Sequence, residues 1–159
     1  MTVLTLSSLS DTKGLGQAIA RSLAAGDVVL LKGPLGAGKT TLARAIIGEL
    51  CGDVAAPSPT YTLVETYEAP AFSLWHFDLY RLEAPHEIWE LGVEEAFADG
   101  VSLIEWPERA EAMMPENALM ISLSLDGETR RAEISGGEDF RARLQKTLSA
   151  FQNRPKDAQ

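Results

Sequence analysis

Apolar residues recur along the chain with two spacings, which divide it into short strands and amphipathic helices. Continuous or alternating apolar runs predict strands, and apolar residues three or four positions apart predict helices. The predicted strands are residues 3–6, 27–32, 61–68, 71–78, 101–104, 119–125 and 130–134. The predicted helices are residues 39–50, 85–91, 93–98 and 139–151, together with a first helix that is capped by residues 10–12 and ends near residue 25.

The order of these elements predicts one α/β domain. The first half runs strand, loop and helix, which favours parallel strands joined by helices. The second half is rich in antiparallel pairs, with turns predicted at Ala69-Pro70 and around Asp126-Gly127. We therefore expect a three-layer α/β sandwich around a mixed sheet with antiparallel hairpin additions. Residues 1–151 form the predicted domain, and the polar tail at residues 152–159 is expected to be disordered.

The strand at residues 27–32 leads into a glycine-rich segment that indicates a phosphate site. Residues 33–40 read Gly-Pro-Leu-Gly-Ala-Gly-Lys-Thr, which fits the P-loop pattern, and they lie between a strand and a helix as that pattern requires. A plain glycine-rich turn is the less favoured interpretation. Lys39 is expected to contact the β- and γ-phosphates of a nucleotide, and Thr40 to bind its magnesium ion. The predicted cradle comprises Gly33, Leu35, Gly36, Ala37, Gly38, Lys39 and Thr40.

A P-loop hydrolase also needs an acid near the magnesium ion and a group that senses the γ-phosphate. Three segments supply candidates for these catalytic roles. Thr60 follows a diproline segment and is placed like a switch threonine, although it could simply cap a strand. Asp78 closes an apolar strand, where either a metal-associated acid or a helix cap is expected. Glu105 closes another apolar strand, and its carboxylate could hold magnesium or a water molecule bound to it.

The neighbours of these acids each have two interpretations. Alternation along the strand places His76 on the same face as Asp78, and we interpret His76 as a packed, hydrogen-bonded histidine rather than a catalyst. Tyr80-Arg81 could orient the site or a partner, or could be structural. Trp106 could pack near the nucleotide or fill the core. Glu108 ranks below Glu105, because a first-turn glutamate also interacts with a helix dipole.

Composition restricts the partners that this chain can bind directly. Its 23 acidic and 14 basic residues give a net charge of −9, which argues against a direct grip on a nucleic acid backbone. Cys51 is the single cysteine and is interpreted as a packing residue. Because the sequence has no apolar run of about 18 residues and no secretory signal pattern, we expect a cytoplasmic protein that does not enter a membrane.

Four segments taken together resemble the bacterial TsaE (YjeE) family of tRNA threonylcarbamoyladenosine biosynthesis ATPases. They are the loop at residues 33–41, Ser-Pro-Thr-Tyr-Thr-Leu-Val-Glu at 58–65, His-Phe-Asp-Leu-Tyr-Arg-Leu at 76–82 and Ile-Glu-Trp-Pro at 104–107. The resemblance covers roughly residues 10–135 of this chain. A P-loop alone is generic, whereas this combination in this order is specific, and it implies a P-loop NTPase-like sandwich.

The resemblance implies a weak ATPase that binds ATP or ADP with Mg²⁺. It also implies action with the partner proteins TsaD and TsaB, which transfer a threonylcarbamoyl group to adenosine 37 of tRNAs that read codons beginning with A. Contact with tRNA would then be indirect, through that complex. By the same resemblance, nucleotide and metal residues are carried over to Lys39, Thr40, Thr41, Asp78, Glu105, Trp106 and Arg130.

One position departs from the family pattern, and two other functions remain open. Pro34 stands where many family members carry an acid; the phosphate nest needs no side chain there, so binding is unaffected, but any role of that acid is lost. A small-molecule kinase would usually need an arginine-bearing lid, which does not stand out in the sequence. A regulatory nucleotide switch is the other alternative, and the sequence lacks the Asn-Lys-x-Asp signature of guanine recognition, which favours adenine.

Overall fold

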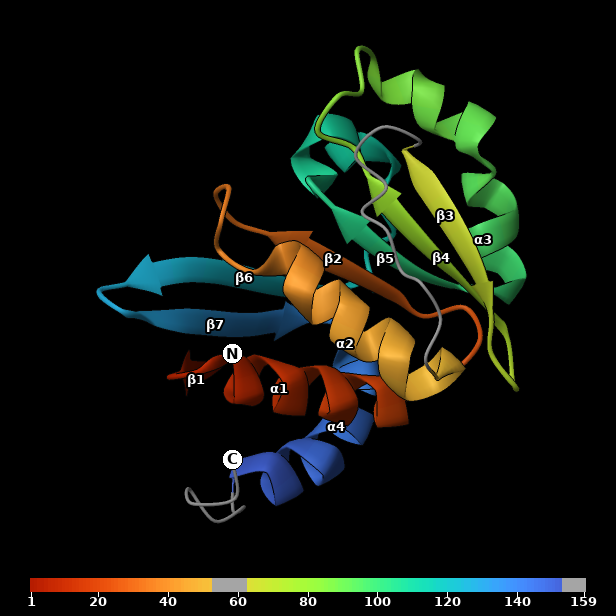
Figure 1. The fold of residues 1–159 in the computed structure, drawn as a ribbon. Helices are drawn as coiled ribbons and strands as arrows, with labels where there is room; N and C mark the ends of the chain where they lie inside the picture. The colour runs from red at the N-terminus through yellow and green to blue at the C-terminus, as the bar shows by residue number, and fades with distance from the viewer. Residues whose placement is uncertain (53–62, 153–159) are drawn as a thin grey trace.

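The computed structural model describes residues 1–52 and 63–152, which form three layers around one seven-stranded sheet (Figure 1). The strand order is β1-β7-β6-β2-β5-β4-β3. Strands β6, β2, β5 and β4 run parallel to one another, whereas β7 and β3 pair antiparallel with β6 and β4, and β1 pairs antiparallel with β7. The predicted sandwich around a mixed sheet with antiparallel additions is confirmed.

The elements follow the hydrophobic pattern of the chain, and both predicted hairpins, β3–β4 and β6–β7, are present. The strands are β1 (Thr2–Leu6), β2 (Val28–Lys32), β3 (Val64–Glu68), β4 (Ser73–Asp78), β5 (Val101–Glu105), β6 (Leu119–Asp126) and β7 (Thr129–Gly136). The α-helices are α1 (Leu9–Ser22), α2 (Lys39–Cys51), α3 (Val93–Asp99) and α4 (Glu138–Gln152). Two 3₁₀ helices, η1 (Pro85–Leu91) and η2 (Pro107–Met113), both begin at a proline.

Helix α1 differs from its predicted bounds at both ends. Ser8, not residues 10–12, is the N-cap, because its hydroxyl oxygen accepts a hydrogen bond from the backbone N–H of Asp11 at 3.2 Å. The helix ends at Ser22, where Leu23 adopts an extended backbone. At the other end of the chain, Gln152 belongs to α4 rather than to the predicted tail. Residues 153–159 and the proline-rich connector at 56–60 lie outside the described residues.

The sheet is covered by helices on both faces, and each face has its own hydrophobic cluster. Helices α1, α2 and α4 lie on one face, and α3, η1 and η2 lie on the other (Figure 1). The first cluster includes Leu15, Ile19, Leu42, Ile46, Leu144 and Leu148 from its helices. The second includes Phe77, Leu79, Ile88, Val93 and Ala96. None of the helices in the described ranges is long and apolar enough to span a membrane.

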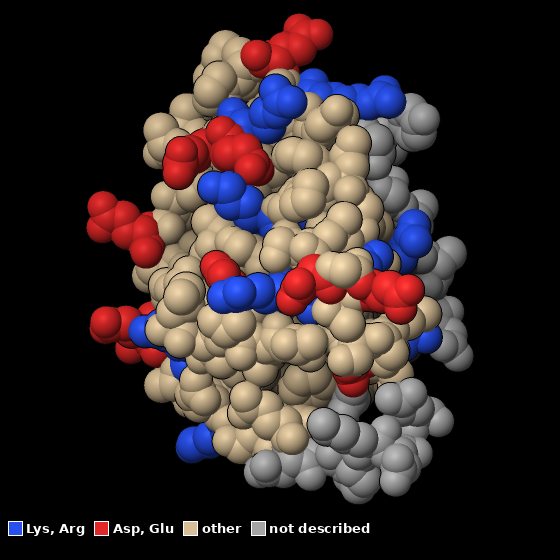
Figure 2. Space-filling model, turned by 90° about the vertical axis from the view of Figure 1, so that its left-hand side faces the viewer, with Lys and Arg blue, Asp and Glu red and all other residues tan. Residues whose placement is uncertain are grey.

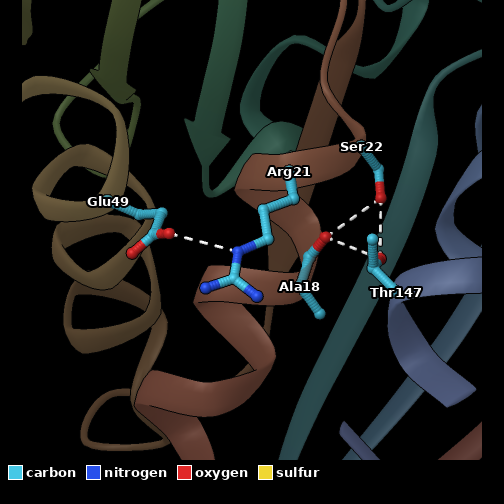
Figure 3. Close-up of polar contacts among 5 residues, drawn as sticks. All are labelled: Ala18, Arg21, Ser22, Glu49 and Thr147. Atoms are coloured by element: carbon cyan, nitrogen blue, oxygen red, sulfur yellow. Dashed lines mark hydrogen bonds and ion pairs between the residues drawn. The ribbon is translucent and has the colours of Figure 1, made fainter. Parts of the chain in front are cut away.

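Helix α1 joins the other two helices of its layer (Figure 3). On one side, Arg21 of α1 forms an ion pair with Glu49 of α2 at 3.2 Å. On the other side, the hydroxyls of Ser22 and of Thr147 on α4 both donate to the carbonyl oxygen of Ala18, at 2.9 and 2.8 Å. The ion pair is exposed and contributes little, so α2 is held in the layer mainly by the buried apolar residues that it shares with α1.

Candidate functional site

The candidate site lies at the edge of the sheet where the parallel strands end. The β2 strand leads into the P-loop, β4 ends at Asp78 and β5 ends at Glu105. Asp78 is in register with Glu105, and Glu105 with Leu31 of β2, so the three strand ends are adjacent. Figure 2 shows the molecule from the side of this edge. On this face, Lys and Arg side chains are interspersed with Asp and Glu side chains despite the net charge of −9 of the whole chain. Ligand sites are common at such carboxyl edges of α/β sheets.

Helix α2 presents an open N-terminus to this edge. Its N-cap is Gly38, with φ of 105°, a backbone conformation that glycine adopts without strain. Among the described residues, no side chain caps this end and its first turn carries no acid. The backbone amides of the first turn therefore point toward the site together with the positive end of the helix dipole, which suits an anionic group.

Lys39 is almost completely buried, with 5% of its surface exposed, and its ammonium group lies inside the loop. The Nζ donates hydrogen bonds to the carbonyl oxygens of Gly33 and Pro34, the latter at 2.9 Å. It also lies 4.2 Å from the centre of the Trp106 ring, close enough for a cation–π interaction. The cation is thus held by neutral groups of the loop and is positioned to meet an anion that enters it.

Burial lowers the pKa of Lys39 below its ordinary value of 10.5, because the charged form loses hydration. The nearby carboxylates of Glu105, Glu108 and Asp78 act in the opposite direction and raise it. Negative charge around the loop therefore supports the protonated form that phosphate binding requires.

Thr40 and Glu105 connect the loop to the sheet. The Thr40 hydroxyl donates to Oε1 of Glu105 at 2.8 Å, across 65 positions of sequence. Glu105 is 2% exposed, and its second oxygen, Oε2, lies 2.6 Å from Nε2 of His76 on β4. The hydroxyl and carboxylate expected at a magnesium ion are therefore neighbours, which the sequence could not show.

Asp78 combines the two interpretations given to it. Its Oδ1 accepts a hydrogen bond from the backbone N–H of Tyr80 at 3.0 Å, which closes the turn after β4. It also lines the same cavity as Thr40 and Glu105. Its role as a metal-associated acid stays a prediction.

A cavity of about 350 Å³ opens over these groups, within the range of small-molecule sites. Most of the predicted site residues meet there, including Arg130 from the β6–β7 hairpin. Its lining is Leu35, Gly36, Gly38, Lys39, Thr40, Thr41, Asp78, Tyr80, Arg81, Glu105, Trp106 and Arg130. The predicted loop residues Gly33 and Ala37 do not line the cavity. Ala37 is buried, and Gly33 packs closely against the β6 backbone. The predicted switch threonine, Thr60, lies outside the described residues.

Aromatic and basic side chains form one wall of this cavity. Trp106 has φ of 59° and ψ of 49°, a left-handed conformation that is rare for a large side chain. Its ring packs against Tyr80 at 4.9 Å between centroids, and the guanidinium of Arg109 lies 5.5 Å from the Tyr80 ring. Trp106 therefore packs beside the candidate nucleotide site as well as against the core cluster of that face.

A second cavity, of about 250 Å³, adjoins the first and was not anticipated from the sequence. The two cavities share Gly38, Thr41 and Arg130. The rest of the second cavity is lined by Leu6, Ser7, Ser8, Leu9, Thr12 and Glu128. The β1–α1 junction carries no motif, and the pairing of β1 with β7 together with the packing of α1 against α2 brings it to this edge.

Replacing Gly33 with alanine is expected to destabilise the fold by about 2–4 kcal/mol. Gly33 has φ of 149°, and a Cβ there would lie 2.4 Å from the carbonyl oxygen of Leu123, a backbone atom that cannot move independently. Urea unfolding would measure the change. The control is Gly48→Ala on α2, where a Cβ meets nothing within 4 Å and alanine should raise stability by about 0.5–1 kcal/mol. Equal stability of the Gly33→Ala and wild-type proteins would contradict the prediction.

Comparison with known proteins identifies the family. The model of the family described as threonylcarbamoyl adenosine biosynthesis protein TsaE matches residues 6–133. The chain belongs to the TsaE family. This TsaE-family chain is 44% identical over 132 residues to the tRNA threonylcarbamoyladenosine biosynthesis protein TsaE of Rickettsia conorii, covering 82% of this chain and 75% of that protein. The resemblance inferred from the four segments is confirmed.

Other relatives agree with this assignment. Identity to TsaE of Haemophilus influenzae is 36% over 127 residues, covering 79% of this chain and 78% of the relative. The crystal structure of Bacillus subtilis YdiB superimposes with a TM-score of 0.74 at 26% identity, covering 96% of both chains. The similarity is thus seen in sequence for the two TsaE proteins and in fold for YdiB.

Proposed function

We propose that this TsaE-family chain binds ATP with Mg²⁺ and hydrolyses it slowly, in support of tRNA threonylcarbamoyladenosine formation. The observation that carries the proposal is the hydrogen bond from Thr40, beside the phosphate-loop lysine, to the buried carboxylate of Glu105. It brings together a cation, a hydroxyl and an acid at an open helix N-terminus. This is the set of groups that a P-loop hydrolase places around a magnesium-bound nucleotide.

The oxygen atoms of the site could bind magnesium if the nucleotide phosphates and water supplied the remaining ligands. Thr40 and Glu105 would hold the ion, with Asp78 close by, and all three offer the hard oxygen ligands that Mg²⁺ prefers. Among the described residues, no group of three or more His, Cys, Asp or Glu side chains could hold a metal alone. This incomplete donor set is typical of a magnesium ion shared with phosphates and water. When bound, the ion would offset the negative charge of the phosphates.

The two adjoining cavities suit the two ends of a nucleotide. In this proposal the phosphates occupy the larger cavity, against the amides of α2 and the Lys39 ammonium. The nucleoside occupies the smaller one, next to Thr41 and the β1–α1 junction. Arg130 lines both cavities and would reach the phosphate chain between them. Adenine is the proposed base because the sequence lacks the guanine signature.

We propose that hydrolysis is weak until a partner covers the site. Two of the three hydrogens of the Lys39 ammonium are donated to the Gly33 and Pro34 carbonyls, so a phosphate has to share this cation with them or displace them. At the rim of the cavity, Leu35 is 69% exposed and Tyr80 is 39% exposed, so apolar surface is available for a partner. In this proposal the partner is the TsaD–TsaB complex, and tRNA is reached only through it. A cytoplasmic location stays a prediction.

ADP binding is expected to change the fluorescence of Trp106. When Lys39 moves from the Trp106 ring to the phosphates, the charge 4.2 Å from the ring is withdrawn and the emission should change. The variant Trp106→Phe should lose this response while still binding ADP by calorimetry. The control Trp89→Phe removes a tryptophan that is 45% exposed on η1 and should keep the response. An undiminished signal in Trp106→Phe would show that the ring does not report the site.

Reconstitution tests the proposal as a whole. ATP turnover and modified tRNA would be measured with the isolated chain, with TsaD and TsaB alone, and with all three proteins. We expect turnover to rise at least about tenfold when all three are combined, and repeated cycles of modification to require this chain. Vigorous hydrolysis by the isolated chain would contradict the partner requirement. A preference for GTP, or phosphorylation of a small metabolite, would favour the switch or kinase alternatives.

A further inference from the structure

His76 and Glu105 form a buried pair beneath the candidate magnesium site. His76 has no exposed surface and Glu105 has 2%. His76 on β4 is in register with Leu103 on β5, two residues before Glu105, so both side chains project from the same face of the sheet. Their Nε2 and Oε2 atoms are 2.6 Å apart, a short hydrogen bond. The pair lies one side chain away from Thr40, which bonds the other oxygen of the same carboxylate.

The Glu105 carboxylate is therefore held on both sides, but the two contacts differ. The Thr40 hydroxyl belongs to the loop, and in the proposed function it turns toward a metal ion. Once Thr40 has turned away, the hydrogen bond from His76 is the remaining contact, among the described residues, that fixes the orientation of the Glu105 carboxylate. It comes from an interior strand, paired on both edges, that a ligand does not need to move.

Within the described residues, the histidine ring has one hydrogen bond, and that bond is to Glu105. A carboxylate only accepts, so the hydrogen of this bond is on Nε2. Nδ1 is buried and has no partner within the described residues. A histidine that served the core alone would gain from a second partner or from replacement by an apolar residue, because an unsatisfied buried nitrogen costs free energy.

We propose that His76 is a positioning residue that orients Glu105 toward the magnesium ion. The inference rests on the proposed function, because it assumes that Glu105 faces a metal. His76 does not touch substrate; it fixes which carboxylate oxygen faces Thr40 and the cavity. Outer partners that orient a metal ligand in this way typically contribute 10- to 100-fold to metal affinity or activity.

The test compares two substitutions that differ in hydrogen bonding. His76→Gln keeps a donor near the place of Nε2, whereas His76→Leu keeps an apolar side chain but removes the donor. For each variant, ADP binding is measured by calorimetry in EDTA and at increasing Mg²⁺. We expect His76→Leu to raise the half-saturating Mg²⁺ concentration about tenfold or more and His76→Gln to stay within about threefold of wild type. ADP affinity in EDTA should be the same in all three proteins.

The possible outcomes separate this proposal from the proposed function. If the wild-type protein binds no ADP, or binds it without regard to Mg²⁺, the proposed nucleotide site is wrong. If the wild type is Mg²⁺-dependent and His76→Leu is unchanged, or both variants lose equally, the positioning role is overturned. In a Glu105→Gln background, His76→Leu should have no further effect on Mg²⁺ dependence, because the carboxylate that it orients is gone; a further loss there would also overturn the role.

A measurement on the wild-type protein covers the case in which a variant fails to fold. A long-range ¹H–¹⁵N spectrum distinguishes the two neutral histidine tautomers. With no nucleotide or metal added, His76 should carry a hydrogen on Nε2. A hydrogen on Nδ1 together with none on Nε2 would mean that Nε2 does not donate to Glu105, and the proposal would be wrong.

Discussion

Replacing Lys39 with alanine is expected to lower nucleotide affinity about 100-fold and any ATP turnover by about 10²–10³-fold. Lys39 is the only cation of the phosphate loop itself, and its buried ammonium is held by two carbonyl oxygens that a phosphate would displace. A positive charge in a site with little water interacts more strongly with phosphate than a surface lysine does. Binding of ATP and ADP by calorimetry, and phosphate release, would measure the two losses.

The control for this change is Lys146→Ala, which removes one positive charge from the exposed side of α4. It should leave binding and turnover unchanged, because only the phosphate contact is expected to matter and not the net charge. Retention of affinity within about threefold in Lys39→Ala would contradict the assignment of the loop. Far-ultraviolet circular dichroism of both variants would separate a loss of binding from a loss of fold.

The same lysine predicts a pH dependence. Burial lowers the pKa of Lys39, so it loses its proton at a lower pH than the ordinary value of 10.5. Since phosphate binding needs the charged form, ATP affinity should fall as pH rises through this lowered pKa and recover when pH is reduced again. The corresponding step should be absent in Lys39→Ala. An affinity that is flat in the wild type up to pH 10.5 would contradict the effect of burial.

Replacing Glu105 with glutamine is expected to reduce Mg²⁺-dependent hydrolysis by at least about 100-fold while ADP binding in EDTA is retained. Glutamine has nearly the same shape but no charge. Its single oxygen can accept from Thr40 or from His76 but not from both, and the metal loses a carboxylate. Because a buried charge is itself costly, the fold should tolerate the neutral residue. Hydrolysis in the presence of TsaD and TsaB, and ADP binding with and without Mg²⁺, would measure the effect.

Glu108→Gln is the matched control, since it removes the same charge three residues further along on an exposed position of η2. The Glu108 carboxylate raises the pKa of Lys39 by its negative charge, but Glu108 is not one of the residues that line the cavity. We expect it to retain most of the activity. Equal losses in both variants would indicate a general electrostatic effect rather than a specific role for Glu105.

Local sequence determined most of the fold of this chain. Leu42 and Ile46 lie on one stripe of a helix and are completely buried in the cluster under that helix. The alternation at residues 76–79 likewise predicted that Phe77 and Leu79 lie on one face of the sheet, in the second hydrophobic cluster, and that His76 lies on the opposite face. These predictions succeeded because the spacing of apolar residues depends on helix and strand geometry, which is the same in every fold. The predicted N-cap of α1 was wrong. Ser8 and Ser10 are both residues that favour the N-cap position, so the local sequence alone did not distinguish them.

The candidate site was predictable in part. The loop at residues 33–40 could be identified because the P-loop pattern is a fixed spacing of glycine, lysine and threonine within eight residues and does not depend on distant segments. Its role in binding a nucleotide stays a prediction. The pairing of Thr40 with Glu105 was not predictable, because it depends on β2 lying next to β5 in the parallel sheet. The prediction that His76 is a packed, hydrogen-bonded residue is confirmed. Its partner, Glu105, was not predictable for the same reason, since it is 29 positions away.

The sequence by itself determined the local chemistry of this protein: a phosphate loop between a strand and a helix, acids at two strand ends, and the pattern of a TsaE-family chain. The tertiary structure alone decided which of these groups meet. It placed Glu105 between Thr40 and His76, placed the Lys39 ammonium over the Trp106 ring, and brought the β1–α1 junction to the same edge of the sheet as the P-loop. The physical reason is that spacing encodes contacts within one element, whereas contacts between elements follow from strand order and burial of both faces of the sheet.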